Sequence, residues 1–236
     1  MANDYFELKQ FKIHQDRCAM KVTTDACVHG SWTPIEPEIK NILEIGCGTG
    51  IITLMLCQRI PNATVCAVEI DGQAAIQAQE NFEASKWRDR IKVMNQDARE
   101  LVLSEKFDLI ICNPPYFLDS LRNPDIRLRT ARHDDTLTFK DLVTITNKFL
   151  APNGILSVMY PDTEFAAFER FMSVSGYYLR HKLLMKHRPS AKVNRMVGVF
   201  VKELSNYTEE ELFLFNEDYT SSSKFIELLQ PFYLYL

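Results

Sequence analysis

Leu43-Glu44-Ile45-Gly46-Cys47-Gly48-Thr49-Gly50 is the most informative run of this chain, because it follows an apolar, strand-like segment and precedes a helix-like one. Glycines in such a loop let the backbone turn sharply and let a ligand approach the helix N-terminus closely. A dinucleotide-binding loop would have its third glycine at position 51, but that residue is Ile51. The loop therefore predicts a ligand site and points away from NAD. The alternative is a tight turn without a ligand.

The surrounding sequence alternates between strand-like and helix-like segments. Apolar runs bounded by turn residues predict buried strands over 41–45, 64–69, 91–95, 107–112 and 154–160. Helix-like stretches cover 51–59, 72–85, 139–150 and 164–175. This alternation predicts an α/β fold in which a parallel sheet carries helices on both faces. Two further runs, 177–185 and 195–202, predict an antiparallel hairpin at the sheet edge and bring the number of strands to seven.

Length and composition fit a single domain over residues 1–236. The chain is 46% hydrophobic and 25% charged, which is typical of a globular protein with a sizeable core. We expect a core over 39–202, an N-terminal segment over 1–38 that covers the ligand cleft, and an acidic, aromatic tail over 203–236 that is partly helical. No signal peptide or long apolar span is evident, so a soluble, cytoplasmic protein is expected. The six cysteines form no C-x-x-C pair, and the histidines do not cluster, so no metal site and no disulfides are expected.

The glycine loop resembles motif I of the class I methyltransferases, which have the E-x-G-x-G-x-G pattern. The resemblance implies a Rossmann-like fold and S-adenosyl-L-methionine as cofactor, with contacts from Glu44, Gly46, Gly48 and Gly50. Glu69 ends the second strand nineteen residues after Gly50, where an acid accepts hydrogen bonds from ribose hydroxyls. The alternative for Glu69 is a solvated acid.

The third strand is followed by Asp97, which in class I enzymes commonly faces the adenine amino group of the cofactor. An aspartate after a strand also serves often as a helix cap, and that alternative stays open. Ile70 and Ala98, which follow Glu69 and Asp97 directly, complete the contacts expected at these two strand ends. Asn113, after the fourth strand, is also expected to contact the cofactor.

Asn113-Pro114-Pro115-Tyr116 follows the fourth strand, at the edge where open α/β sheets build their sites. Consecutive prolines keep the backbone extended and leave carbonyl groups able to point into a cleft. An exocyclic amine conjugated to a ring attacks a sulfonium poorly until its hydrogens are held, and the Asn113 side-chain oxygen and the Pro114 carbonyl are suitable acceptors. Tyr116 offers a ring on which a base can stack. The alternative is a turn that only ends the strand.

This tetrapeptide resembles the [DNS]-P-P-[YFW] signature of methyltransferases that act on planar amino nitrogens. Those nitrogens include adenine N6, cytosine N4, guanine N2 and the glutamine side-chain amide. The signature therefore predicts the class of nitrogen and leaves the substrate open.

The segment from Phe11 to Trp32 resembles the N-terminal signature of bacterial tRNA1(Val) adenine-N6 methyltransferases, which modify the adenosine 3′ of the anticodon. The matching positions are Asp16, Arg17, Ala19, Met20, Lys21, Thr24, Asp25, Gly30 and Trp32. The chain departs from the pattern at Thr23, Ala26 and His29, where the family commonly has glycine, glycine and leucine. We expect Gln15, Thr24 and Asp25 to contact the methionine part of the cofactor. Thr24 and Asp25 could instead cap the following helix.

Two basic segments suggest an RNA partner. Residues 177–202 contain seven Lys and Arg and no acid, and since the net charge of the chain is −4, the remaining residues carry −11. The alternative is a solvated sheet edge defended by lysines. The residues expected to contact tRNA phosphates, while the adenine is flipped out of its stack, are Arg122, Arg127, Arg129 and Arg132 in the loop after Tyr116, and Lys186, Arg188, Lys192 and Arg195 in the hairpin.

Other functions remain possible from the sequence. Protein glutamine N5-methyltransferases carry the same tetrapeptide but usually have a helical N-terminal domain, and only about forty residues precede the first strand here. Guanine-N2 methyltransferases of ribosomal RNA normally have a second methyltransferase-like half. DNA adenine methyltransferases normally have a base-recognition domain. A binding module without chemistry would not be expected to preserve N-P-P-Y.

Overall fold

A mixed sheet of eight strands forms the centre of the molecule. The computed structural model describes residues 3–36, 38–114 and 137–236. The strands lie in the order β10-β8-β9-β7-β6-β3-β4-β5. The parallel part consists of β3 (Asn41–Ile45), β4 (Thr64–Glu69), β5 (Ile91–Asn95), β6 (Phe107–Cys112) and β7 (Leu150–Tyr160).

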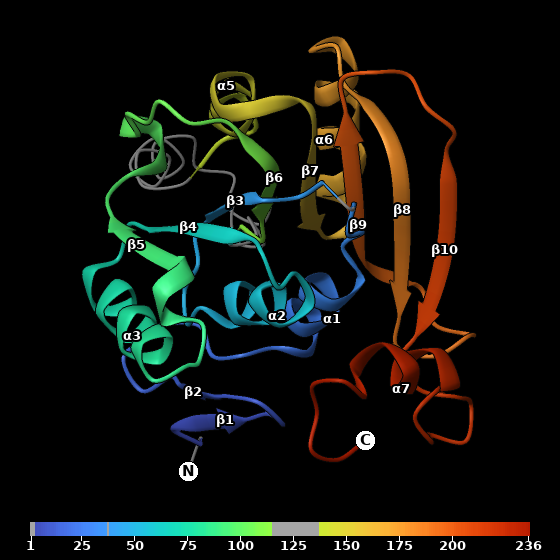
Figure 1. Ribbon diagram of the computed structural model, residues 1–236. Coiled ribbons are helices and arrows are strands. Elements are labelled where there is room, and N and C mark those ends of the chain that lie inside the picture. Colours follow the sequence, from blue (N-terminus) through green and yellow to red (C-terminus); the bar gives the residue numbers. More distant parts are fainter. Residues whose placement is uncertain (1–2, 37, 115–136) are drawn as a thin grey trace, which may run out of the picture.

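Helices cover both faces of this sheet (Figure 1). One face packs against α1 (Thr24–Trp32), α2 (Ile51–Arg59) and α3 (Gly72–Glu83), and the other against α5 (Phe139–Phe149) and α6 (Asp162–Val174). The strands supply both hydrophobic clusters by alternation. In β6, Leu109 and Ile111 belong to the cluster with α1–α3, whereas Ile110 and Cys112 belong to the cluster with α5 and α6.

The bounds of β3, β4, β5 and β6 are those predicted from the apolar runs. Strands that are buried on both faces need apolar residues at every position, so the run itself marks the strand. The helices begin and end within two residues of their predicted limits. The side chains of Thr23, Asp71 and Thr138 cap the N-termini of α1, α3 and α5, and that of Ser222 caps α7 (Ser223–Leu229).

The sheet has one more strand than expected. β8 (Tyr178–Lys186) and β9 (Val193–Val201) form the predicted antiparallel hairpin, but it does not end the sheet, because β10 (Thr208–Phe213) pairs in parallel with β8. β9 pairs in turn with β7, antiparallel. β10 contains three consecutive glutamates, a residue depleted in strands, and therefore gives no strand signal in the sequence.

The two ends of the chain pack together on the side of α1–α3 (Figure 1). β1 (Tyr5–Glu7) and β2 (Lys12–His14) form a two-stranded ribbon, and Lys9 donates a backbone hydrogen bond of 2.7 Å to Phe232 after α7 (Ser223–Leu229). Asn81 of α3 bonds both backbone polar groups of His14, at 2.8 and 2.9 Å. Two short 3-10 helices, Arg88–Arg90 and Ala98–Glu100, flank β5.

All six cysteines are free and buried. In the described parts of the chain, no helix is both long enough and apolar enough to cross a bilayer. The same residues contain no cluster of three or more side chains suited to holding a metal ion.

Candidate methyltransferase site

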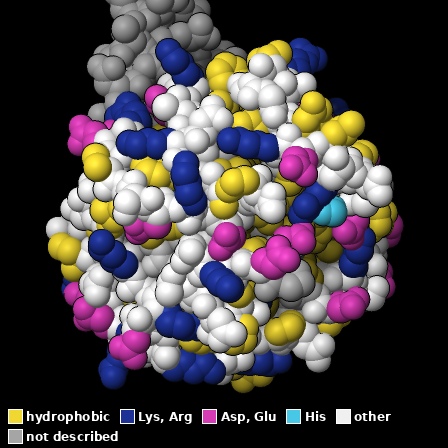
Figure 2. All heavy atoms as spheres, turned by 45° about the horizontal axis from the view of Figure 1, so that its top comes forward, with side chains coloured by type: hydrophobic (Ala, Val, Ile, Leu, Met, Phe, Trp, Pro, Cys, Tyr) yellow, Lys and Arg dark blue, Asp and Glu magenta, His cyan; other side chains and the backbone are white. Residues whose placement is uncertain are grey.

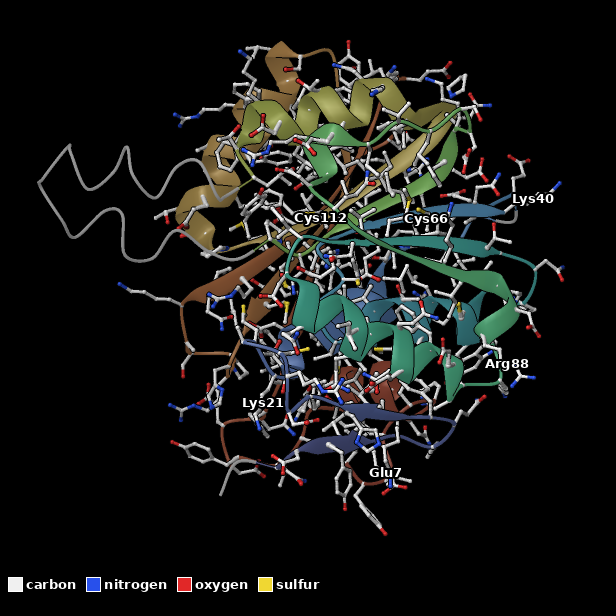
Figure 3. The ribbon with its side chains drawn as sticks, turned by 90° about the vertical axis from the view of Figure 1, so that its left-hand side faces the viewer. Glu7, Lys21, Lys40, Cys66, Arg88 and Cys112 are labelled. Carbon is white, nitrogen blue, oxygen red and sulfur yellow. The ribbon has the colours of Figure 1, made fainter. Side chains whose placement is uncertain are left out.

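A cavity of about 360 Å³ lies at the carboxyl edge of the parallel strands. Figure 3 shows this edge: Cys112, at the end of β6, and Lys21 lie toward one side, whereas Lys40 and Arg88, which precede β3 and β5, lie toward the other. The lining includes these members of the predicted site: Glu44, Gly46, Gly48, Glu69, Ile70, Asp97, Ala98, Asn113 and Pro114. Residues predicted from separate motifs thus surround one space.

The glycine loop turns through left-handed backbone conformations. Gly46, Gly48 and Gly50 have φ of 72°, 52° and 82°, which side chains disfavour. Gly50 does not line the cavity, contrary to its expected cofactor contact. A Cβ at Gly50 would lie 2.3 Å from the ring of Phe82, so glycine is needed there for packing against α3.

Glu69 holds the loop in position. Its Oε2 accepts a hydrogen bond of 2.8 Å from the Gly48 N–H, and its Oε1 accepts one of 3.0 Å from the Asp71 N–H. The side chain is 8% exposed and lines the cavity. A carboxylate accepts about four hydrogen bonds, so Glu69 retains capacity for two hydroxyl groups of a ligand.

Glu44 lies deeper in the cavity wall. It is 2% exposed and accepts a hydrogen bond from the Thr53 hydroxyl of α2. Burial raises the pKa of Glu44 to about 8. A positively charged ligand group beside it would favour the ionised form and lower that pKa.

Asp97 both caps a helix and lines the cavity. Its Oδ1 accepts a hydrogen bond of 2.8 Å from the Arg99 N–H, and this bond caps the N-terminus of the 3-10 helix Ala98–Glu100. The Arg99 guanidinium contacts Oδ2 at 2.8 and 2.5 Å and lowers the pKa of Asp97. Asp97 therefore caps the 3-10 helix, as the alternative predicted. It also lines the cavity while paired with Arg99.

Asn113 and Pro114 continue directly from β6 into the cavity wall, and Leu137 joins them from the start of the segment before α5. Pro115 and Tyr116 lie outside the described residues, as do Arg122, Arg127, Arg129 and Arg132. Their expected roles remain predictions.

The N-terminal segment supplies one wall through residues that the sequence did not single out for this purpose. Cys18, Ala19, Met20, Lys21, Val22, Thr23 and Ala26 line the cavity. The match of Ala19, Met20 and Lys21 to the family pattern is a signal that could have found them. Cys47, Thr49, Asp71, Gln96 and Arg99 also line it.

The three cofactor contacts expected from this segment are corrected by the structure, because Gln15, Thr24 and Asp25 do not line the cavity. The Gln15 amide bonds the Val22 N–H at 2.8 Å and the Asn3 carbonyl at 2.9 Å, so it braces the segment. Thr23, and not Thr24, caps α1. Asp25 faces Arg195, with Oδ2 3.2 Å from Nε.

Most cations of the basic hairpin have acidic partners. Three of these partners, Glu209, Glu211 and Glu217, lie later in the chain. Lys186 Nζ lies 2.6 Å from Glu211 Oε1, and Arg188 Nη1 lies 3.8 Å from Glu217 Oε2. The excess of +7 in the sequence is therefore not an open positive field, which corrects the simple picture of a phosphate-facing patch. On the face displayed in Figure 2, lysines and arginines are likewise interspersed with acids. Lys192 is exposed at the tip of the hairpin.

Comparison with known proteins identifies close relatives. The family model of the methyltransferase small domain matches residues 33–172. A curated protein from Bacteroides fragilis (strain YCH46) is 41% identical over 237 residues and covers 99% of both chains. One from Dyadobacter fermentans is 38% identical and covers 98% of both. Each is named tRNA1(Val) (adenine(37)-N6)-methyltransferase.

Solved structures share the fold. A predicted O-methyltransferase from Agrobacterium tumefaciens superposes with a TM-score of 0.65 at 18% identity, over 86% of this chain and 93% of that one. A glycopeptide N-methyltransferase solved with S-adenosyl-L-methionine gives 0.56 at 14% identity, over 79% and 97%. The predicted Rossmann-like fold of class I methyltransferases is therefore confirmed, and with full-length relatives at this level of identity the chain belongs to the methyltransferase small-domain family.

Proposed function

We propose that this protein transfers a methyl group from S-adenosyl-L-methionine to N6 of adenosine 37 in tRNA1(Val). The observation that carries the proposal is one shared cavity, in which Asn113 and Pro114 face the same space as Gly46, Gly48 and Glu69. A methyl donor and a planar amine must meet in such a space. The full-length relatives supply the identity of the RNA.

The residues present fit the cofactor. The cavity volume lies within the range of small-ligand sites, and its wall combines apolar side chains with a few fixed polar groups. The Glu69 carboxylate would accept the ribose hydroxyls, Ile70 would cover one face of the adenine, and Asp97 would lie near its amino group. When bound, S-adenosyl-L-methionine supplies an electrophilic methyl group on a sulfonium sulfur.

The chain's own contribution to the reaction is the placement of the amine. The Asn113 side-chain oxygen and the Pro114 carbonyl would accept the two N6 hydrogens, which draws the nitrogen lone pair out of the ring system. Tyr116 would stack against the base. The nitrogen becomes acidic once methylated and then loses its proton, so positioning rather than a strong base carries the catalysis.

The RNA would reach this site from the carboxyl edge of the sheet. Lys192 and the arginines after Tyr116 are the strongest candidates for phosphate contacts. Lys186, Arg188 and Arg195 already have acidic partners, so phosphates would have to compete for them.

The test is mass spectrometry of nucleosides from unmodified tRNA incubated with the protein and methyl-labelled cofactor. We expect labelled N6-methyladenosine in tRNA1(Val), and a loss of at least about a hundredfold in Asn113→Ala, because the amine then lacks one acceptor. Cofactor affinity should be nearly unchanged in that variant. Label in a protein glutamine, and in no RNA, would replace the proposed substrate with that of the protein glutamine methyltransferases.

A further inference from the structure

The ion pair between Asp25 and Arg195 joins two parts of the molecule that meet at the carboxyl edge of the sheet. Asp25 is the second residue of α1, and Arg195 lies on β9, opposite Met185 of β8. The two side chains are only 22% and 20% exposed. An ion pair with this degree of burial is costly to break on one side only, because the remaining charge loses its partner in a poorly solvated place.

Asp25 stands in the sequence between residues that line the cavity wall. Residues 18–23 line the cavity, and so does Ala26, on the other side of Asp25 in the sequence. The Thr23 hydroxyl accepts a hydrogen bond of 3.1 Å from the Ala26 N–H, so residues 23–26 form one capped turn. A shift of Asp25 would therefore displace lining residues on both sides of it.

The rest of this wall is tied to other parts of the molecule. Arg17 contacts Glu80 of α3 at 2.8 Å, and Gln15 and Lys21 bond the first residues of the chain. The pair between Asp25 and Arg195 ties the wall to the β8–β9 hairpin. The wall is therefore held from two sides, by α3 and by this hairpin.

We infer that Asp25 and Arg195 are positioning residues for the cofactor, because their ion pair holds residues 18–23 in place as a wall of the cavity. Neither residue needs to touch the cofactor for this role. The inference rests on the proposed function only for the identity of the ligand.

The experiment measures the Kd of S-adenosyl-L-methionine by titration calorimetry, without RNA, for the full chain and for Asp25→Asn, Arg195→Gln and the double variant. Each single variant should weaken binding by about tenfold. The double variant should weaken it by no more than either single one, since the pair acts as a unit. For Asp25→Asn, turnover at saturating cofactor and saturating tRNA should stay within about twofold of wild type while the KM for S-adenosyl-L-methionine rises.

Glu36→Gln is the matched control. Glu36 pairs with Arg180 on the same hairpin, but at the opposite end of β8, away from the cavity. Arg180 is 21% exposed, like Arg195, whereas Glu36 is 42% exposed. We expect the same Kd as wild type in this variant. An equal loss in Glu36→Gln would show that only general stability is at work, and would overturn the inference.

Two further results would overturn it. Unchanged affinity in folded Asp25→Asn would show that the wall does not depend on the pair, and additive losses in the double variant would show that the two residues act separately. Either result leaves the proposed function standing. A wild-type chain that binds no S-adenosyl-L-methionine would refute the proposed cofactor, and the inference with it.

Discussion

Glu69 combines two tasks at the scale of single residues, since it fixes the glycine loop and faces the cavity. Both of its oxygens accept backbone N–H groups. A glutamine at this position has one oxygen and one NH₂ group, so one N–H would meet a donor. Replacing Glu69 with glutamine would therefore disturb both the glycine loop and the contact with a ligand.

We therefore expect Glu69→Gln to weaken S-adenosyl-L-methionine binding by about 10- to 100-fold, which corresponds to roughly 1.5–3 kcal/mol for hydrogen bonds to a charged group. Calorimetric titration measures the change. Glu105→Gln, an exposed acid before β6, serves as the control for the altered net charge. Equal affinities in Glu69→Gln and wild type would remove Glu69 from the cofactor site.

His29 makes the stability of the protein depend on pH. It is fully buried in α1, shares a hydrogen bond of 2.9 Å with Ser157 of β7, and has its pKa lowered to about 3 by burial. In the unfolded chain a histidine has a pKa near 6.5. Between these values the unfolded state binds a proton that the folded state does not, so stability falls as the pH falls below 6.5.

Lowering the pH from 7.5 to 5.5 should cost about 1.4 kcal/mol through His29 alone, from the linkage relation. Urea unfolding at the two pH values measures it. His29→Leu should lose this part of the pH dependence, because leucine does not titrate. Identical pH dependence in the variant and wild type would show that folding does not shift the pKa of His29.

At the scale of elements, β10 supplies acids that pair with the cations of the basic hairpin. Its glutamates lie beside β8, where Glu211 pairs with Lys186 and Glu209 lies 3.8 Å from Lys182. The loop after β10 adds Glu217, which bonds the Ser190 N–H at 2.8 Å and approaches Arg188. Acids of the tail thus pair with Lys182, Lys186 and Arg188, and Glu217 also bonds the loop at the tip of the hairpin.

Replacing Glu211 and Glu217 should leave Lys186 and Arg188 without these acidic partners. We expect Glu211→Gln/Glu217→Gln to bind tRNA about 3- to 10-fold more tightly at low salt, with a steeper salt dependence, because Lys186 and Arg188 become available to phosphates. Filter binding over a range of salt concentrations measures both quantities. Glu203→Gln, at an exposed position just after β9, controls for net charge, and an equal gain there would contradict the specific role of the two pairs.

At the scale of the whole molecule, the residues that line the cavity and the residues proposed to contact RNA are different sets. Arg127→Gln/Arg129→Gln/Arg188→Gln/Lys192→Gln should therefore lose methylation of tRNA and retain S-adenosyl-L-methionine binding. Loss of the phosphate contacts of Arg127, Arg129 and Lys192, together with any that Arg188 makes in competition with Glu217, should reduce tRNA affinity by about a hundredfold or more at physiological salt. Unchanged tRNA affinity, measured by filter binding, would place the RNA on another face.

The sequence alone determined the parallel strands and the glycine loop, and it predicted the role of Asn113. Buried parallel strands are continuous apolar runs, and the glycines and prolines restrict the backbone locally, so these features are readable without a partner. Motifs that follow strands β3, β4, β5 and β6 meet at one edge because the strands are parallel. For that reason Gly46, Glu69, Asp97 and Asn113 could be grouped from their positions at the ends of the apolar runs.

Only the tertiary structure decided which charged and polar side chains pair with each other. Asp25 pairs with Arg195, and Lys186 with Glu211, across separations in sequence that no local pattern encodes. β10 is a strand because β8 offers it an edge and matching cations, although its own residues disfavour that state. Pairing between distant segments depends on where the fold brings them, and this explains why Gln15, Thr24 and Asp25 brace or flank the cavity wall without lining it.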